Sequence, residues 1–145
     1  MTEDKNLIGV AGQYYVAFRL ATRGYAVGIT PRGTTSIDLI VANPTSRKSI
    51  TIQTKTMRNA FMQSKTYGNY WKWRVGKPRE PHESFFYTFV DLKGNLEQIP
   101  DVFIVPSMQL ASLLSDEYPD WCNKINKGNE QNYKNKWDII KAELG

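Results

Sequence analysis

Three polar side chains in one short stretch have the types and spacing of a metal and phosphate site. Asp38 lies in an apolar run, and Gln53 and Lys55 stand two residues apart in a second run that is rich in β-branched residues. A carboxylate and an amide oxygen can bind a divalent cation, and an ammonium group can bind a phosphate. The chemistry that this set would support is hydrolysis of a phosphodiester, which needs a metal, a positioned water and a cation near the phosphate.

The stretch 36–55 predicts a β-hairpin, because turn-forming residues separate two runs of strand-forming residues. If the turn is symmetric about its middle, residues whose numbers sum to 91 face each other, so that Asp38 lies opposite Gln53 (38 + 53). Lys55 then projects from the same face as Gln53. The alternative is that Asp38 only opens a strand, and that Gln53 and Lys55 belong to an ordinary solvated strand face.

Composition and charge limit the classes of protein that this sequence can encode. Its 145 residues, of which 41% are hydrophobic, suit one domain with a sizeable core. No apolar run reaches the roughly 20 residues of a membrane helix, and the N-terminus does not resemble a signal peptide. A single cysteine, Cys122, and a single histidine, His82, argue against a disulfide, a zinc site and a Cys–His dyad, and we expect a cytoplasmic protein. The net charge of +5 permits a polyanionic partner.

The elements that must position these residues follow from hydrophobic periodicity. The predicted elements are a helix over 3–23, strands over 25–30, 36–42, 49–55, 85–90 and 102–105, a helix over 108–114 with Ser107 as its N-cap, an irregular segment over 116–132, and a terminal helix over 133–144. The first helix has two largely apolar stripes, so we expect it to be buried over much of its circumference on the sheet. Gln13 interrupts the second stripe, and it is either a site residue or a glutamine on the helix surface.

The segment 57–83 interleaves basic and aromatic residues, as in nucleic-acid-binding surfaces. Strict alternation over 71–75 predicts a strand with one aromatic face and one basic face. The alternative is that Trp71 and Trp73 fill the core while Lys72 and Arg74 are merely solvated, and both descriptions hold if only the basic face meets a ligand. The candidate nucleic-acid contacts are Arg32, Arg58, Lys65, Lys72, Arg74 and Lys77.

The order of elements and six short stretches of sequence resemble the PD-(D/E)xK nuclease superfamily, which has the restriction-endonuclease-like fold and includes Holliday junction resolvases. The matching residues are Gly12-Gln13, Gly24-Tyr25, Asp38, Gln53-Thr54-Lys55 and the later runs 89–92 and 103–107. The resemblance implies an α/β fold in which helices flank a mixed β-sheet. It implies one nuclease domain over 1–145, with a core at about 3–114 and a helical extension at about 115–145.

The same resemblance implies a role for each matching residue. Asp38 would be the principal metal ligand, the Gln53 amide oxygen and the Thr54 backbone carbonyl would be further ligands, Lys55 would be the catalytic cation, and Gln13 would be the helix residue of the site. The implied cofactor is Mg²⁺ or Mn²⁺, with no small-molecule cofactor. The implied partners are DNA and a second copy of the chain in a homodimer.

Two departures from the superfamily pattern leave the activity open. Gln13 stands where glutamate is common and Gln53 where Asp or Glu is usual, so the site has one formal negative charge instead of two. Because hard cations prefer carboxylate oxygens, metal affinity is expected to be low. The chain would then be a weak Mg²⁺- or Mn²⁺-dependent endonuclease, or a nuclease-fold subunit that only binds DNA or joins an assembly. A third interpretation is a small protein-interaction domain.

Overall fold

The computed structural model describes residues 4–31, 37–66, 68–95, 97–117 and 120–145. Along the chain the elements are α1 (Lys5–Ala21), β1 (Ala26–Ile29), β2 (Leu39–Ala42), β3 (Ser49–Met57), β4 (Phe61–Ser64), β5 (Gly68–Arg74), β6 (Phe85–Asp91), β7 (Asp101–Pro106), α2 (Ser107–Leu110), η1 (Ala111–Leu113), β8 (Leu114–Glu117), β9 (Asp120–Asn126), η2 (Glu130–Asn132) and α3 (Asp138–Leu144). None of the helices in these ranges is long and apolar enough to cross a membrane.

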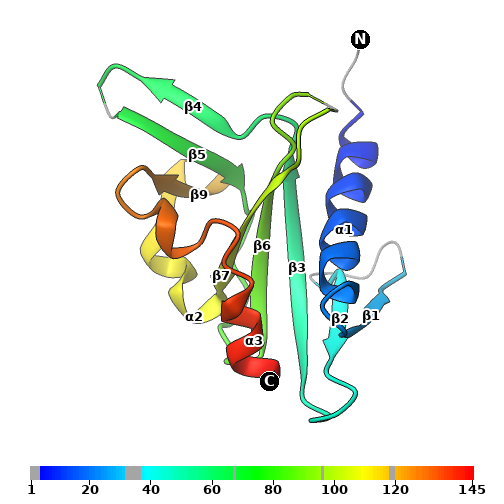
Figure 1. The fold of residues 1–145 in the computed structure, drawn as a ribbon. Coiled ribbons are helices and arrows are strands. Elements are labelled where there is room, and N and C mark those ends of the chain that lie inside the picture. The colour runs from blue at the N-terminus through cyan, green and yellow to red at the C-terminus, as the bar shows by residue number, and fades with distance from the viewer. Residues whose placement is uncertain (1–3, 32–36, 67, 96, 118–119) are drawn as a thin grey trace.

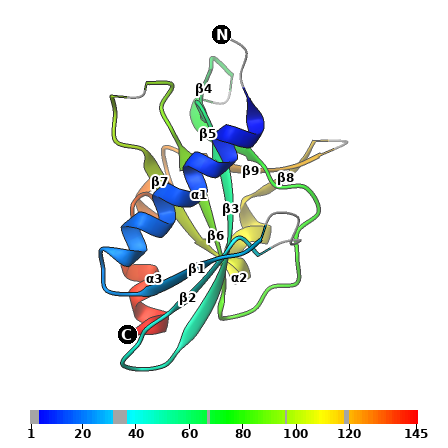
Figure 2. The same cartoon turned by 90° about the vertical axis from the view of Figure 1, so that its right-hand side faces the viewer.

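The elements form three layers around a mixed sheet with the strand order β1-β2-β3-β6-β7 (Figure 1). Strands β3 and β6 are parallel, and the other neighbours in this sheet are antiparallel. Helices α1 and α3 cover one face, while α2 and a second sheet, ordered β4-β5-β9-β8, cover the other (Figures 1 and 2). This arrangement confirms the predicted α/β class with a mixed sheet flanked by helices.

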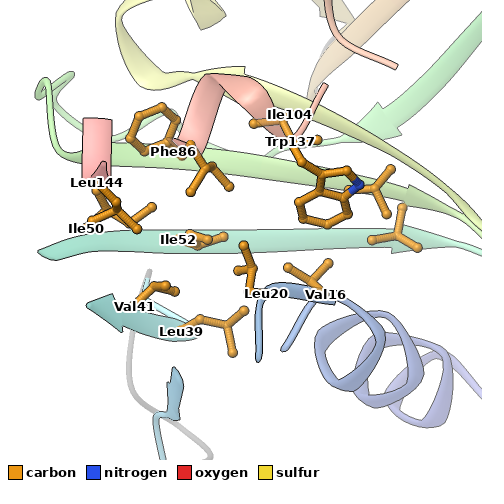
Figure 3. Close-up of a cluster of buried hydrophobic side chains, with 13 residues drawn as sticks. Val16, Leu20, Leu39, Val41, Ile50, Ile52, Phe86, Ile104, Trp137 and Leu144 are labelled. Carbon is orange, nitrogen blue, oxygen red and sulfur yellow. The ribbon is translucent and has the colours of Figure 1, made fainter. Parts of the chain in front are cut away.

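The core beneath α1 and α3 is built from aliphatic side chains that alternate along the strands (Figure 3). Val16 and Leu20 of α1 pack on Leu39 and Ile52 of the sheet. Trp137, which directly precedes α3, belongs to the same cluster. Burying such side chains contributes about 1.5–3 kcal/mol each to folding. This cluster therefore fixes α1 against β2 and β3, the two strands of the predicted hairpin.

Helix α1 lies very close to the sheet, and it packs there through one face only. Its N-cap is Asp4, whose carboxylate accepts hydrogen bonds from two backbone N–H groups of the first turn. Gly12 meets Thr56 of β3 so closely that a Cβ at position 12 would lie 1.8 Å from the Thr56 Oγ1 atom. The expectation of burial around much of the helix was wrong, because the apolar stripe of Leu7, Val10, Tyr14 and Phe18 is exposed.

The predicted hairpin register is confirmed. Leu39 pairs with Ile52 and Ala42 with Ser49, so that paired residues sum to 91 (39 + 52). The Asn43 side chain accepts the Thr45 N–H at 2.9 Å and so stabilises the turn.

The C-terminal third of the chain differs most from the prediction. The segment 116–132 was predicted to be irregular, but it contains the second half of β8 and all of β9, which extend the second sheet beside β5. The terminal helix begins at Asp138 and not at Tyr133, because the Tyr133 carbonyl accepts the Ile104 N–H at 3.0 Å. Ser107 is not a helix cap, since its hydroxyl donates to the His82 carbonyl at 2.7 Å.

Candidate active site

The candidate site lies where β3 extends beyond the end of β2. Strand β2 stops pairing at Leu39, opposite Ile52, whereas β3 continues to Met57 alongside β6. From Gln53 onward, no strand in the described part of the chain pairs with β3 on the β2 side. Asp38 stands at the start of this uncovered edge, where backbone groups of β3 are accessible to a side chain or a ligand.

The Asp38 carboxylate takes the place of a strand partner. Its Oδ2 atom accepts the Thr54 N–H at 2.7 Å, and its own backbone N–H donates to the Ile52 carbonyl at 2.8 Å. The N–H and C=O of one strand residue point to the same edge, so the Thr54 carbonyl also lies on this edge. The Thr54 hydroxyl is engaged elsewhere, 2.9 Å from the hydroxyl oxygen of Thr88 on β6.

Gln13 holds the backbone of Asp38. The Gln13 Nε2 atom donates to the Asp38 carbonyl at 3.1 Å, and the same oxygen accepts the Thr30 N–H at 3.0 Å, while the Thr30 hydroxyl donates to the neighbouring Ile37 carbonyl at 2.6 Å. Helix α1 and the end of β1 thus fix the position from which the carboxylate reaches β3. These bonds explain why a glutamine lies on the sheet-facing side of an otherwise apolar helix face.

Gln53 and Lys55 project from the face of β3 opposite α1. The alternation along the strand places Ile52 and Thr54 toward α1, and Gln53 and Lys55 toward the second sheet. Both side chains are half-buried. Lys55 lines a pocket of about 380 Å³ whose described lining residues are Lys5, Ile8, Lys55, Thr56, Met57, Trp73 and Arg74.

Three cationic side chains from α1, β3 and β5 converge on this pocket, and none of its described lining residues is acidic. Like charges that lie close together raise the local potential and favour an anion. Sequence reasoning missed Lys5, because a lysine in the first turn of a helix carries no signal of a site 50 residues further along the chain (55 − 5).

A second basic residue that was not predicted lies near the opposite end of the same face of β3. Arg79 lines a pocket of about 310 Å³ together with Thr51 of β3, and Ile37, which precedes Asp38, lines it too. The Arg79 backbone N–H donates to the Tyr87 hydroxyl at 3.3 Å. Burial raises the pKa of Tyr87, so its phenol stays neutral and anchors this loop.

The chemistry of the donor set fits a hard divalent cation. The Asp38 carboxylate, the Gln53 amide and the Thr54 carbonyl offer oxygen atoms, which Mg²⁺ and Mn²⁺ prefer. In the described ranges, no three His, Cys, Asp or Glu side chains gather into a metal-binding group. The oxygen atoms that these three residues offer therefore carry one formal negative charge, that of Asp38.

The tryptophans of β5 belong to the core and not to a binding surface. Trp71 is 5% exposed and Trp73 is 1% exposed, and the Trp73 indole N–H donates to the Val90 carbonyl at 2.9 Å. Lys72 and Arg74 project from the other face of β5, where Lys72 pairs in register with Lys124 of β9. The structure thus confirms the alternation and assigns the aromatic face to the space between the two sheets.

The remaining predicted nucleic-acid contacts occupy separate loops. Arg58 lies in the connection between β3 and β4, Lys65 in the turn after β4 and Lys77 in the loop after β5. Arg32 lies outside the described residues.

A solved nuclease structure shares this fold. The structure of a bacterial homing endonuclease, I-Ssp6803I, matches this chain with a TM-score of 0.68 and 15% sequence identity, over 99% of this chain and 95% of that chain. The fold is that of a nuclease. A comparison with known protein families finds no match, and a search of curated proteins finds no similar sequence.

Proposed function

We propose that this protein is a metal-dependent nuclease of the PD-(D/E)xK type that hydrolyses phosphodiester bonds of DNA at Asp38, Gln53 and Lys55. The observation that carries the proposal is the 2.7 Å hydrogen bond from the Thr54 N–H to the Asp38 carboxylate. It gathers a carboxylate and a backbone carbonyl on one edge, beside the strand face that presents Gln53 and Lys55. The fold of a homing endonuclease supports the same assignment.

In this proposal the metal is held by oxygen atoms of Asp38, Gln53 and Thr54. A bound Mg²⁺ or Mn²⁺ would neutralise charge on the phosphate and lower the pKa of water at the site. With one carboxylate in place of the usual two, we expect weak binding and dependence on millimolar metal.

The protein's own side chains have distinct tasks in this proposal. Lys55 binds the phosphate that is attacked and stabilises its developing negative charge, and Lys5 and Arg74 hold the neighbouring part of the DNA backbone in the same pocket. Gln13 is a positioning residue, because it contacts the carbonyl of Asp38 rather than its carboxylate.

A second candidate function is DNA binding without catalysis. It is favoured by the two glutamines, since Gln13 is occupied by the Asp38 backbone and Gln53 contributes no charge. A nuclease-fold binder would keep the basic pocket and the cationic face of β5 while losing the metal.

We also propose that the active form is a homodimer, because one site can cut only one strand of a duplex at a time. A duplex has two backbones of opposite direction, and a two-fold axis relates two sites in the matching way.

The proposal is tested by titrating wild type and Asp38→Ala with Mg²⁺ and then Mn²⁺ in a calorimeter, followed by plasmid cleavage at saturating metal. We expect heat of binding and nicking in wild type, loss of both in Asp38→Ala, and loss of nicking with retained DNA binding in Lys55→Ala. The matched control is Lys48→Ala in the hairpin turn, which should cleave like wild type.

Each negative result has a defined meaning. DNA binding without cleavage or metal binding would overturn the nuclease and leave the second candidate. Absence of DNA binding at low salt would overturn both, because non-specific phosphate contacts are strongest there.

A further inference from the structure

Helix α1 exposes a continuous apolar stripe on the side that faces away from the sheet. Leu7 is 66% exposed, Tyr14 is 58% exposed and Phe18 is 61% exposed, and Val10 is 38% exposed beside them. Their spacing along the helix aligns them on one side. Figure 2 looks onto this side, where α1 crosses the sheet obliquely with no other element in front of it.

The exposed stripe is not the face of α1 that packs on the sheet. Val16 and Leu20 pack on the sheet and are fully buried, and they point to the opposite side of the helix. The charged residues within α1, Lys5 and Arg19, also lie off the stripe. Lys5 lines the basic pocket, and Arg19 donates to the Tyr15 hydroxyl at 3.0 Å and lies over the Trp137 ring.

The exposed area is of a size that marks an interaction surface. An aromatic side chain buries about 150–250 Å² when fully covered, so Tyr14 and Phe18 each leave on the order of 100 Å² in water. With Leu7 and Val10 the stripe reaches a few hundred Å², in the range of the largest apolar patches on monomeric proteins, which are often functional.

We propose that this stripe binds a second copy of the chain, with the two α1 helices packed antiparallel about a two-fold axis. In the pairing whose residue numbers sum to 25, Phe18 of each copy meets Leu7 of the other (18 + 7), and Tyr14 meets Ala11 (14 + 11). A large side chain then faces a smaller one at each contact, as ridges-into-grooves packing requires.

Charge favours a second copy over a nucleic acid at this surface. Each copy carries a net charge of +5, so two copies approach most easily through a face without charged groups. DNA needs cations, and the described residues of the stripe offer none. The antiparallel arrangement also opposes the helix dipoles, so that the start of each helix, capped by Asp4, lies beside the end of the other helix.

The dimer would leave the candidate site accessible. Gln13 points to the sheet side of α1, where it holds Asp38, and Lys5, which lines the basic pocket with Lys55 and Arg74, lies off the stripe. This pairing does not depend on nuclease activity. The modest area predicts a dimer that forms reversibly with increasing concentration.

The test is sedimentation equilibrium of the full chain without DNA or metal, from micromolar to several hundred micromolar protein. We expect the wild-type mass to rise from 16.7 kDa toward twice that value. The double variant Leu7→Ser/Phe18→Ser should remain at the monomer mass throughout. The matched control is Ile99→Ser, which removes an apolar side chain that is 71% exposed elsewhere, and it should dimerise like wild type.

The stripe is exposed to solvent in the monomer, so the double variant leaves the core unchanged and should fold. Its circular dichroism and melting temperature check this. A loss of self-association in this variant can therefore be assigned to the stripe. A wild type that stays monomeric at all concentrations overturns the proposal. Self-association that persists in Leu7→Ser/Phe18→Ser, or a wild-type mass beyond the dimer, overturns the two-fold pairing of α1.

Discussion

At the residue scale, the candidate site depends on Gln53. Gln53 directly precedes Thr54, whose N–H donates to the Asp38 carboxylate, and the Gln53 amide projects from the strand face it shares with Lys55. An amide oxygen is a weaker ligand for Mg²⁺ than a carboxylate, because it contributes no charge to the attraction. Under the proposed function, this one side chain therefore sets how tightly the site holds its metal.

We therefore predict that Gln53→Glu tightens Mn²⁺ and Mg²⁺ binding by about tenfold, because it doubles the negative charge of the donor set. Calorimetric titration measures the change, and plasmid nicking at limiting metal should rise in parallel. Gln63→Glu adds the same charge on the exposed strand β4 and serves as the control. Equal metal affinity in both variants would show that Gln53 is not a ligand.

At the scale of the element, the contact between Gly12 and Thr56 determines the distance between α1 and β3. The neighbouring Gln13 reaches the Asp38 carbonyl only because the helix lies this close. The Thr56 hydroxyl is buried there with no hydrogen-bond partner among the described residues. Packing at one glycine thus positions both the helix and the backbone of the candidate site.

Gly12→Ala should lower the free energy of unfolding by about 1–3 kcal/mol, because the new methyl group overlaps Thr56 and forces α1 away from the sheet. Urea denaturation measures the change. Gly9→Ala is the matched control on the same helix, where a methyl group would meet nothing within 4 Å, and it should raise stability by up to about 1 kcal/mol. Similar effects of the two substitutions would contradict this account of the helix position.

At the scale of the whole molecule, the second sheet separates core from surface. Its inner face supplies Trp71 and Trp73 to the core, and its outer face carries Lys72 and Arg74 of β5 together with Lys124 of β9. A sheet face with this charge suits the phosphate backbone of DNA, and it lies beside the pocket that Arg74 shares with Lys55.

We predict that Lys72→Ala/Arg74→Ala weakens DNA binding and reduces the slope of log affinity against log salt by about 1 for each phosphate that the variant no longer neutralises. Fluorescence anisotropy over a salt series measures both quantities. Lys48→Ala/Lys136→Ala removes the same charge from two other exposed positions and should leave the slope unchanged. An equal effect in both pairs would mean that net charge alone, and not this sheet face, attracts DNA.

Local patterns in the sequence determined the central hairpin, its register and the apolar strand β6. These features depend on residues that are close together in the chain: turn chemistry fixes which residues of β2 and β3 face each other, and that register, which pairs Leu39 with Ile52, brings the Asp38 carboxylate to the Thr54 N–H. The class of the fold follows from the order of such elements.

Only the tertiary structure decided which face of α1 is buried, because both of its stripes are largely apolar and the close approach at Gly12 selects one of them. No local pattern indicated the second sheet either, since β8 and β9 are polar segments, of which β9 pairs with the distant strand β5 and β8 pairs with β9. For the same reason, no local pattern could indicate that Lys5 joins Lys55 and Arg74 at one pocket. Contacts between residues far apart in the chain complete the candidate site, and its hairpin is the part that the sequence alone determines.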